Sequence, residues 1–161
     1  MPQQSEIETV NDSTPMDLEI QRVVDHPGVP ADEDLRRWAE VALDGEGAVM
    51  VNIRVVDEAE GWALNKQWRQ RDSATNVLSF PADSPAVNEA RILGDVVLCA
   101  PVVLREAVEQ GKEAAHHWAH LLIHGLLHLL GYDHIDGDKA EQMEAREIEL
   151  LARLGISNPY Q

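Results

Sequence analysis

Three histidines in the C-terminal half of the chain have a spacing that suits metal binding. His124 and His128 lie four positions apart in an apolar run, and His134 follows after a glycine. Residues four apart in an α-helix lie about 40° apart around its axis and one turn along it, so two imidazoles can reach one ion. Gly131 can adopt the left-handed conformation that ends a helix. The chain can then turn back and bring His134 to the same ion.

The ligand set indicates which ion to expect. Three neutral imidazoles suit zinc and leave a fourth position open for water, although other first-row divalent ions bind them too. We therefore predict one Zn²⁺ or a related ion per chain. A structural zinc site normally has four protein ligands, and Asp133, Asp136 or Asp138 could supply the fourth. His120, one turn before His124, and Asp133 are candidates for supporting the ligands through hydrogen bonds.

The residue after the first histidine bears on the reaction. The spacing H-x3-H-x2-G-x2-H is that of metzincin peptidases, which carry a glutamate there as general base. This chain has Gly125 at that position, with no side chain to accept a proton. A peptidase of that type would lack its base. A metallopeptidase or another metal hydrolase remains an alternative at this point.

The charge of the chain limits its partners. The net charge of −16 argues against nonspecific attraction to nucleic acid, which relies on lysine and arginine. Residues 61–80 differ, because they hold Lys66, Arg69 and Arg71 against one acidic residue, Asp72. On charge alone, the simpler interpretation of this positive segment is a chance excess on a solvated helix face.

Hydropathy and cysteine content indicate where the protein works. No run of 18 apolar residues occurs, so we expect no membrane span and no membrane partner. The first 15 residues lack the basic and apolar regions of a secretory signal. The single cysteine, Cys99, lies in an apolar run and is predicted to be a core residue, which is compatible with a reducing cytosol. We therefore expect a cytoplasmic protein.

The elements that must position these residues form one predicted domain, residues 16–161, after a disordered polar and acidic tail at 1–15. Strands are expected where β-branched and apolar residues gather: 16–24, 48–56, 76–80 and 92–100. Helices are expected at 32–43, 57–70, 101–110 and 112–130 and from 136 or 138 onward, with Trp62, Leu64 and Trp68 facing inward. This order predicts an α+β fold: a small mixed β-sheet of about four strands flanked by helices, with the histidine helix central.

Residues 120–134 (HLLIHGLLHLLGYDH) resemble the signature of the bacterial YbeY family of ribosomal RNA maturation factors. Residues 64–81 (LNKQWRQRDSATNVLSFP) and 93–97 (LGDVV) also resemble segments of that family, in the same order and spacing. The resemblance extends over roughly residues 17–155 and excludes the tail. It implies a metal-dependent, single-strand-specific endoribonuclease that acts in 3′-end maturation of 16S rRNA and in quality control of 70S ribosomes.

The resemblance also assigns residues and partners. It places the metal ligands at His124, His128 and His134, and a functionally essential arginine at Arg69. An arginine can hold a phosphate bidentately and stabilise developing negative charge, so Arg69 within the positive segment is interpreted as catalytic. Single-stranded rRNA on the small ribosomal subunit is the implied substrate. Ribosomal proteins are candidate partners, because the acidic surface suits protein contacts better than naked RNA.

Two questions stay open at this point. The general base could be metal-bound hydroxide, Asp133 or the 2′-hydroxyl of the RNA, since a protonated arginine cannot take that role. A ribosome-binding domain that zinc stabilises, and that has no catalytic activity of its own, is a further alternative to an enzyme.

Overall fold

The computed structural model describes residues 16–24, 26–69, 75–82, 90–133 and 136–161. Within these ranges a four-stranded sheet has the order β1-β2-β4-β3. Its strands are β1 (Met16–Arg22), β2 (Val49–Val56), β3 (Val77–Pro81) and β4 (Arg91–Cys99). β1, β2 and β4 are parallel, and β3 pairs antiparallel with β4 at the edge. The prediction of a small mixed sheet is confirmed.

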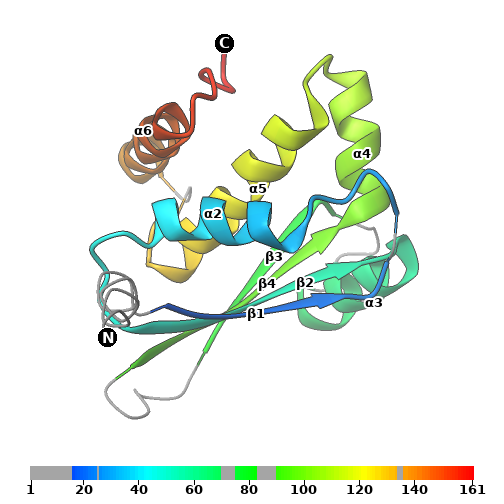
Figure 1. Cartoon of the computed structure of the whole chain (residues 1–161), viewed down its shortest axis with the longest axis horizontal. Helices are drawn as coiled ribbons and strands as arrows, with labels where there is room; N and C mark the ends of the chain where they lie inside the picture. The colour runs from blue at the N-terminus through cyan, green and yellow to red at the C-terminus, as the bar shows by residue number, and fades with distance from the viewer. Residues whose placement is uncertain (1–15, 25, 70–74, 83–89, 134–135) are drawn as a thin grey trace, which may run out of the picture.

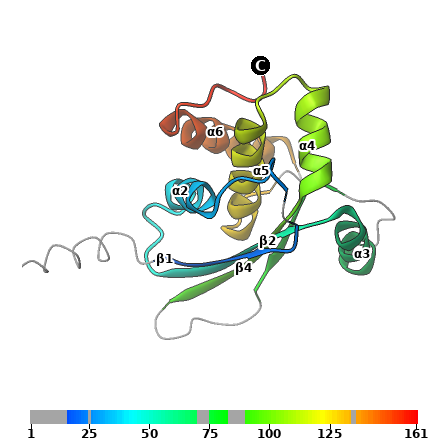
Figure 2. The same cartoon turned by 45° about the vertical axis from the view of Figure 1, so that its right-hand side comes forward.

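The helices lie on both faces of this sheet (Figure 1). They are α2 (Asp32–Ala42), α3 (Glu58–Arg69), α4 (Ala100–Glu109), α5 (Ala114–Leu129) and α6 (Gly137–Arg153). Figure 2 shows α2, α5 and α6 on one side of the sheet and α3 beyond it at one end. The histidine helix α5 is central in this layer, since it contacts α2, α4, α6, β3 and β4. The α+β class is as predicted.

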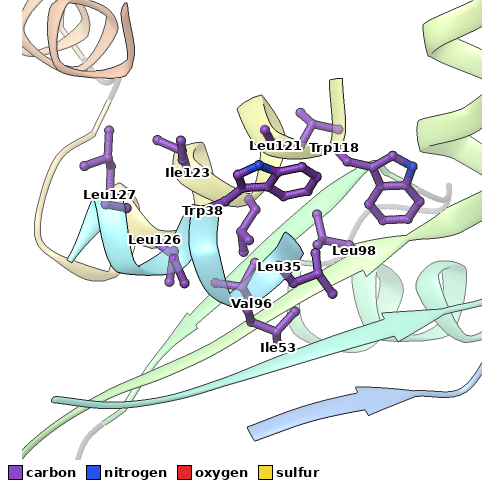
Figure 3. Packing of buried hydrophobic residues seen from close by; sticks show 14 of the residues in the cluster. Leu35, Trp38, Ile53, Val96, Leu98, Trp118, Leu121, Ile123, Leu126 and Leu127 are labelled. Carbon is purple, nitrogen blue, oxygen red and sulfur yellow. The ribbon is translucent and has the colours of Figure 1, made fainter. Parts of the chain in front are cut away.

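The main core lies between the sheet and the helices α2 and α5. Alternate side chains of β2 and β4 face the helices, because successive residues of a strand point to opposite faces. Figure 3 shows this packing, with residues of both strands, of α2 and of α5 interlocked: Ile53, Val96, Leu98, Leu35, Trp38, Trp118, Leu126 and Leu127. Full burial of such a side chain contributes roughly 1.5–3 kcal/mol. The sheet therefore gives α5 a rigid support.

Helix α3 packs on the face of the sheet opposite to α2 and α5. The side of α3 that faces the sheet is not the side predicted from the sequence. Trp62 and Trp68 are 39% and 60% exposed, so the prediction that they face inward is wrong. The helix approaches the sheet at Gly61, where an added Cβ would lie 3.0 Å from Sγ of Cys99. Leu64 packs on this face against a small cluster of buried apolar residues that includes Cys99. Apolar spacing alone does not reveal that α3 contacts the sheet closely at a glycine.

Other local features agree with the sequence. Cys99 is buried as expected, and burial is the main cause that raises the pKa of its thiol, which keeps it unreactive. Among the described residues, no helix is long and apolar enough to cross a membrane. The predicted disordered tail at 1–15 lies outside the described ranges.

Candidate metal centre

Helix α5 lies very close to the sheet at Gly125. The hydroxyl of Ser79 on β3 donates to the carbonyl oxygen of Gly125 over 2.8 Å. A Cβ added at Gly125 would lie 2.8 Å from Cγ1 of Val96, closer than ordinary contact. Any side chain here would require α5 or the side chains of β3 and β4 that face it to move. The glutamate of a metzincin therefore has no room at this position.

His124, next to this contact, is oriented by a carboxylate from another helix. Its Nδ1 lies 2.7 Å from Oε2 of Glu147 on α6, which is fully buried. An ionised carboxylate can only accept, so Nδ1–H donates and the ring carries its lone pair on Nε2. Metal-ligating histidines show this arrangement, with the other ring nitrogen bonded to a carboxylate or a carbonyl.

His128 has the corresponding arrangement with a backbone carbonyl. Its Nδ1 lies 3.1 Å from the carbonyl oxygen of Tyr132, so Nδ1–H donates here too and Nε2 carries the lone pair. The carbonyl is placed by the helix end: Gly131 has φ +106°, and the amide of Tyr132 bonds back to Leu127. This is a Schellman-type C-terminus. The predicted left-handed glycine is confirmed, and it also serves to orient His128.

The two imidazoles lie side by side on α5. Their ring centroids are 4.7 Å apart with an interplanar angle of 80°, and both side chains are partly buried. Two neutral imidazoles with lone pairs on Nε2 are a donor set that suits zinc and its first-row neighbours. The residues present therefore fit such an ion.

Other predicted site residues are only partly placed. His134 lies outside the described residues, as does the side chain of Arg69, whose backbone ends α3. Asp133 is partly buried after the helix end, with one carboxylate oxygen 3.9 Å from Nζ of Lys139. His120 lies one turn before His124 on α5, and its Nε2 is 3.3 Å from Oε2 of Glu147.

A His-His-Glu group in the structure could also bind a metal. His120, His124 and Glu147 each offer a ligand atom, and these atoms lie within 4.8 Å of one another. The sequence reasoning missed Glu147. A signal was present, because this carboxylate occupies a position on the apolar face of α6, between Met143 and Leu150. A charged residue on the buried face of an amphipathic helix needs partners.

The hydrogen bonds around Glu147 keep it ionised. Burial by itself raises the pKa of this carboxyl, but hydrogen bonds from His120, His124 and Tyr160 outweigh burial and lower the pKa to about 2. The pKa of the Tyr160 phenol shifts in the opposite direction, because burial and the neighbouring carboxylate raise it. At neutral pH the phenol therefore donates to a charged carboxylate.

Comparison with known proteins identifies the family of this chain. The family model described as Endoribonuclease YbeY matches residues 25–155, which include the three histidines and Arg69. The chain is 57% identical over 147 residues to Endoribonuclease YbeY of Pseudomonas fluorescens, covering 90% of this chain and 96% of that protein. It is 59% identical over 133 residues to the protein of that name from Stutzerimonas stutzeri, covering 81% and 83%. The chain belongs to the YbeY family.

Membership of the YbeY family confirms the resemblance and the class of enzyme, an endoribonuclease. A solved structure agrees on the fold: TM1509 from Thermotoga maritima superimposes with a TM-score of 0.55 at 27% identity, covering 88% of this chain and 99% of that one. The YbeY match ends at residue 155, so the last residues of the chain, Tyr160 among them, lie outside it.

Proposed function

We propose that this YbeY family protein is a zinc-dependent endoribonuclease that cuts single-stranded RNA at a site formed by His124, His128 and His134. The observation that carries the proposal is the orientation of the first two imidazoles. Each donates its Nδ1–H to a fixed acceptor, Glu147 or the Tyr132 carbonyl, so each presents an Nε2 lone pair. His134 follows the turn at Gly131 and is proposed as the third ligand.

We assign Glu147 to orientation rather than to the ligand set. Direct ligation by His124 through Nδ1 would need the same atoms that now form the 2.7 Å hydrogen bond. That bond is charge-assisted, and the carboxylate also accepts from Tyr160. With the carboxylate occupied in this way, we assign Nε2 as the ligating atom of His124.

The remaining roles follow from the chemistry of the side chains. A divalent ion bound here would supply Lewis acidity and an activated water for phosphodiester hydrolysis. Arg69 is proposed to hold the scissile phosphate and to neutralise its developing charge, since guanidinium stays protonated and pairs with phosphate bidentately. Gly125 leaves the site without the glutamate that peptide hydrolysis would use.

The proposed cellular role is 3′-end maturation of 16S rRNA and quality control of 70S ribosomes, in the cytoplasm. It is supported by family membership and by the match of all three sequence segments. The net charge of −16 supports delivery of the RNA by the small subunit and its basic proteins rather than by attraction to free RNA.

A substrate comparison tests the proposal. Metal-replete protein should cut a single-stranded rRNA fragment, leave the same sequence intact as a duplex, and leave casein intact. Removal of the metal by a chelator should stop RNA cleavage, and added Zn²⁺ should restore it. Gel analysis of the RNA and of casein gives the readout. Casein cleavage would favour the peptidase, and no cleavage of either substrate would favour the ribosome-binding domain.

A second prediction concerns Arg69. Arg69→Ala should lower kcat on the single-stranded fragment by about a hundredfold or more, because loss of one donor to transition-state charge has an effect of that size. Zinc binding, measured by chelator competition, should not change. Lys66→Ala is the matched control: it removes an exposed positive charge, placed over the Trp62 ring, from the same helix. Full cleavage by the Arg69 variant would rule out the proposed role.

A further inference from the structure

The C-terminal segment after α6 reaches the buried carboxylate beside the metal ligands. The phenol of Tyr160 donates to Oε1 of Glu147, and its oxygen lies 3.3 Å from Nε2 of His120. Its ring meets the His120 ring edge-on, with centroids 5.4 Å apart. Figure 2 shows this segment running from α6 toward the start of α5.

This segment is held in place by its own contacts. Nζ of Lys112, before α5, lies 3.4 Å from the carbonyl oxygen of Pro159. The amide of Tyr160 donates to the side chain of Asn158 over 2.8 Å, and Ile156 is buried at the start of the segment. The phenol therefore reaches Glu147 from a segment that makes further contacts of its own.

The position of Glu147 calls for an explanation beyond packing. A fully buried carboxylate is strongly unfavourable unless donors surround it, and an apolar residue of similar size often serves stability as well or better. Here the two oxygens have separate partners. Oε2 faces His124 and His120, and Oε1 accepts from Tyr160.

We propose that Glu147 is a positioning residue that fixes the ring of His124 for metal binding, and that Tyr160 fixes Glu147, so that the C-terminal segment supports the metal centre. With Oε1 hydrogen-bonded to the phenol, rotation of Oε2 away from Nδ1 of His124 would break the hydrogen bonds of both oxygens. The hydrogen bond from Nδ1 of His124 to Glu147 also makes the lone pair on Nε2 of His124 a stronger ligand for a metal. The inference rests on the proposed function only in taking His124 as a metal ligand.

The test uses the entire chain of 161 residues and needs no RNA. Tyr160→Phe removes one hydroxyl and keeps the ring against His120. We expect its dissociation constant for Zn²⁺, from competition with a chromophoric chelator, to rise about tenfold. We also expect the d–d absorption of the Co²⁺-loaded protein to change, because ligand geometry changes. Ser157→Ala, which removes an exposed hydroxyl from the same segment, should leave both unchanged.

A second variant, at Glu147, tests the positioning of His124 separately from the role of Tyr160. Glu147→Gln preserves size and should raise the Zn²⁺ dissociation constant about ten- to hundredfold. A Tyr160→Phe protein with unchanged Zn²⁺ affinity and an unchanged Co²⁺ spectrum would overturn the role of the segment, even if it melted at a lower temperature. If His128→Ala kept a full equivalent of metal while Glu147→Gln lost it, Glu147 would be a ligand itself and the positioning role would be overturned. Because these readouts are independent of RNA cleavage, a failure of the proposed ribonuclease activity would leave them interpretable.

Discussion

His128→Ala is expected to lose its bound zinc and to cut single-stranded RNA at least about a thousandfold more slowly than the parent protein. A catalytic metal contributes several kcal/mol of transition-state stabilisation, and each 1.36 kcal/mol corresponds to about a tenfold change in rate. The hydrogen bond from Nδ1 to the Tyr132 carbonyl leaves the lone pair of this ring on Nε2, and the ring centroid lies 4.7 Å from that of His124. The measurements are metal content after dialysis and initial cleavage rates at equal protein concentration.

The matched control for this variant lies on the same helix. The side chain of His116, near the start of α5, is 40% exposed, and its Nε2 lies 3.9 Å from Oε1 of Glu113. His116→Ala should keep both zinc and activity, and the His128→Ala protein, purified in the same way, controls for contaminating ribonuclease. If His128→Ala retained both properties, His128 would not be a ligand. The metal would then have to be placed on His120, His124 and Glu147.

Gly125→Glu is expected to destabilise the fold by more than about 3 kcal/mol, because it combines overpacking with an unpaired buried charge. The first side-chain atom would already lie 2.8 Å from Cγ1 of Val96 and 3.2 Å from Cγ2 of Val77. Equilibrium unfolding of the metal-free protein in urea measures the effect. Most domains are stable by only about 5–15 kcal/mol, so the loss should also lower the soluble yield.

The same substitution at a second glycine provides the control. Gly137 is the first residue of α6, and among the described residues no atom beyond its chain neighbours and the backbone of its own helix lies within 4 Å of a Cβ added there. A negative charge at a helix N-terminus is favourable by about 0.3–1 kcal/mol, so Gly137→Glu should be neutral or stabilising. Equal stability of the two variants would refute the close packing of α5 on the sheet. Casein cleavage by a folded Gly125→Glu protein would revive the peptidase alternative.

The sequence alone determined the features that depend on neighbours along the chain. The four strands and the five described helices lie close to where the patterns predicted them, because period and turn residues are local properties. Asp136 caps α6 by accepting from the amide of Lys139, and Gly131 ends the histidine helix in the left-handed conformation. The spacing of His124 and His128 predicted that their rings would lie together, and the structure confirms it. The motif segments also identified the family before any fold was known.

The tertiary structure decided which segments meet. The outward position of Trp62 and Trp68 follows from the close approach of α3 at Gly61, which apolar spacing cannot reveal. The partners of the histidines lie far along the chain: Glu147 comes from α6 and Tyr160 from beyond the family match. Hydrogen bonds of this kind depend on how α5, α6 and the C-terminal segment pack against one another. Patterns within one segment of the sequence do not specify the relative orientation of segments that are far apart along the chain. The histidine motif predicted a metal site, and packing determined how its rings are held.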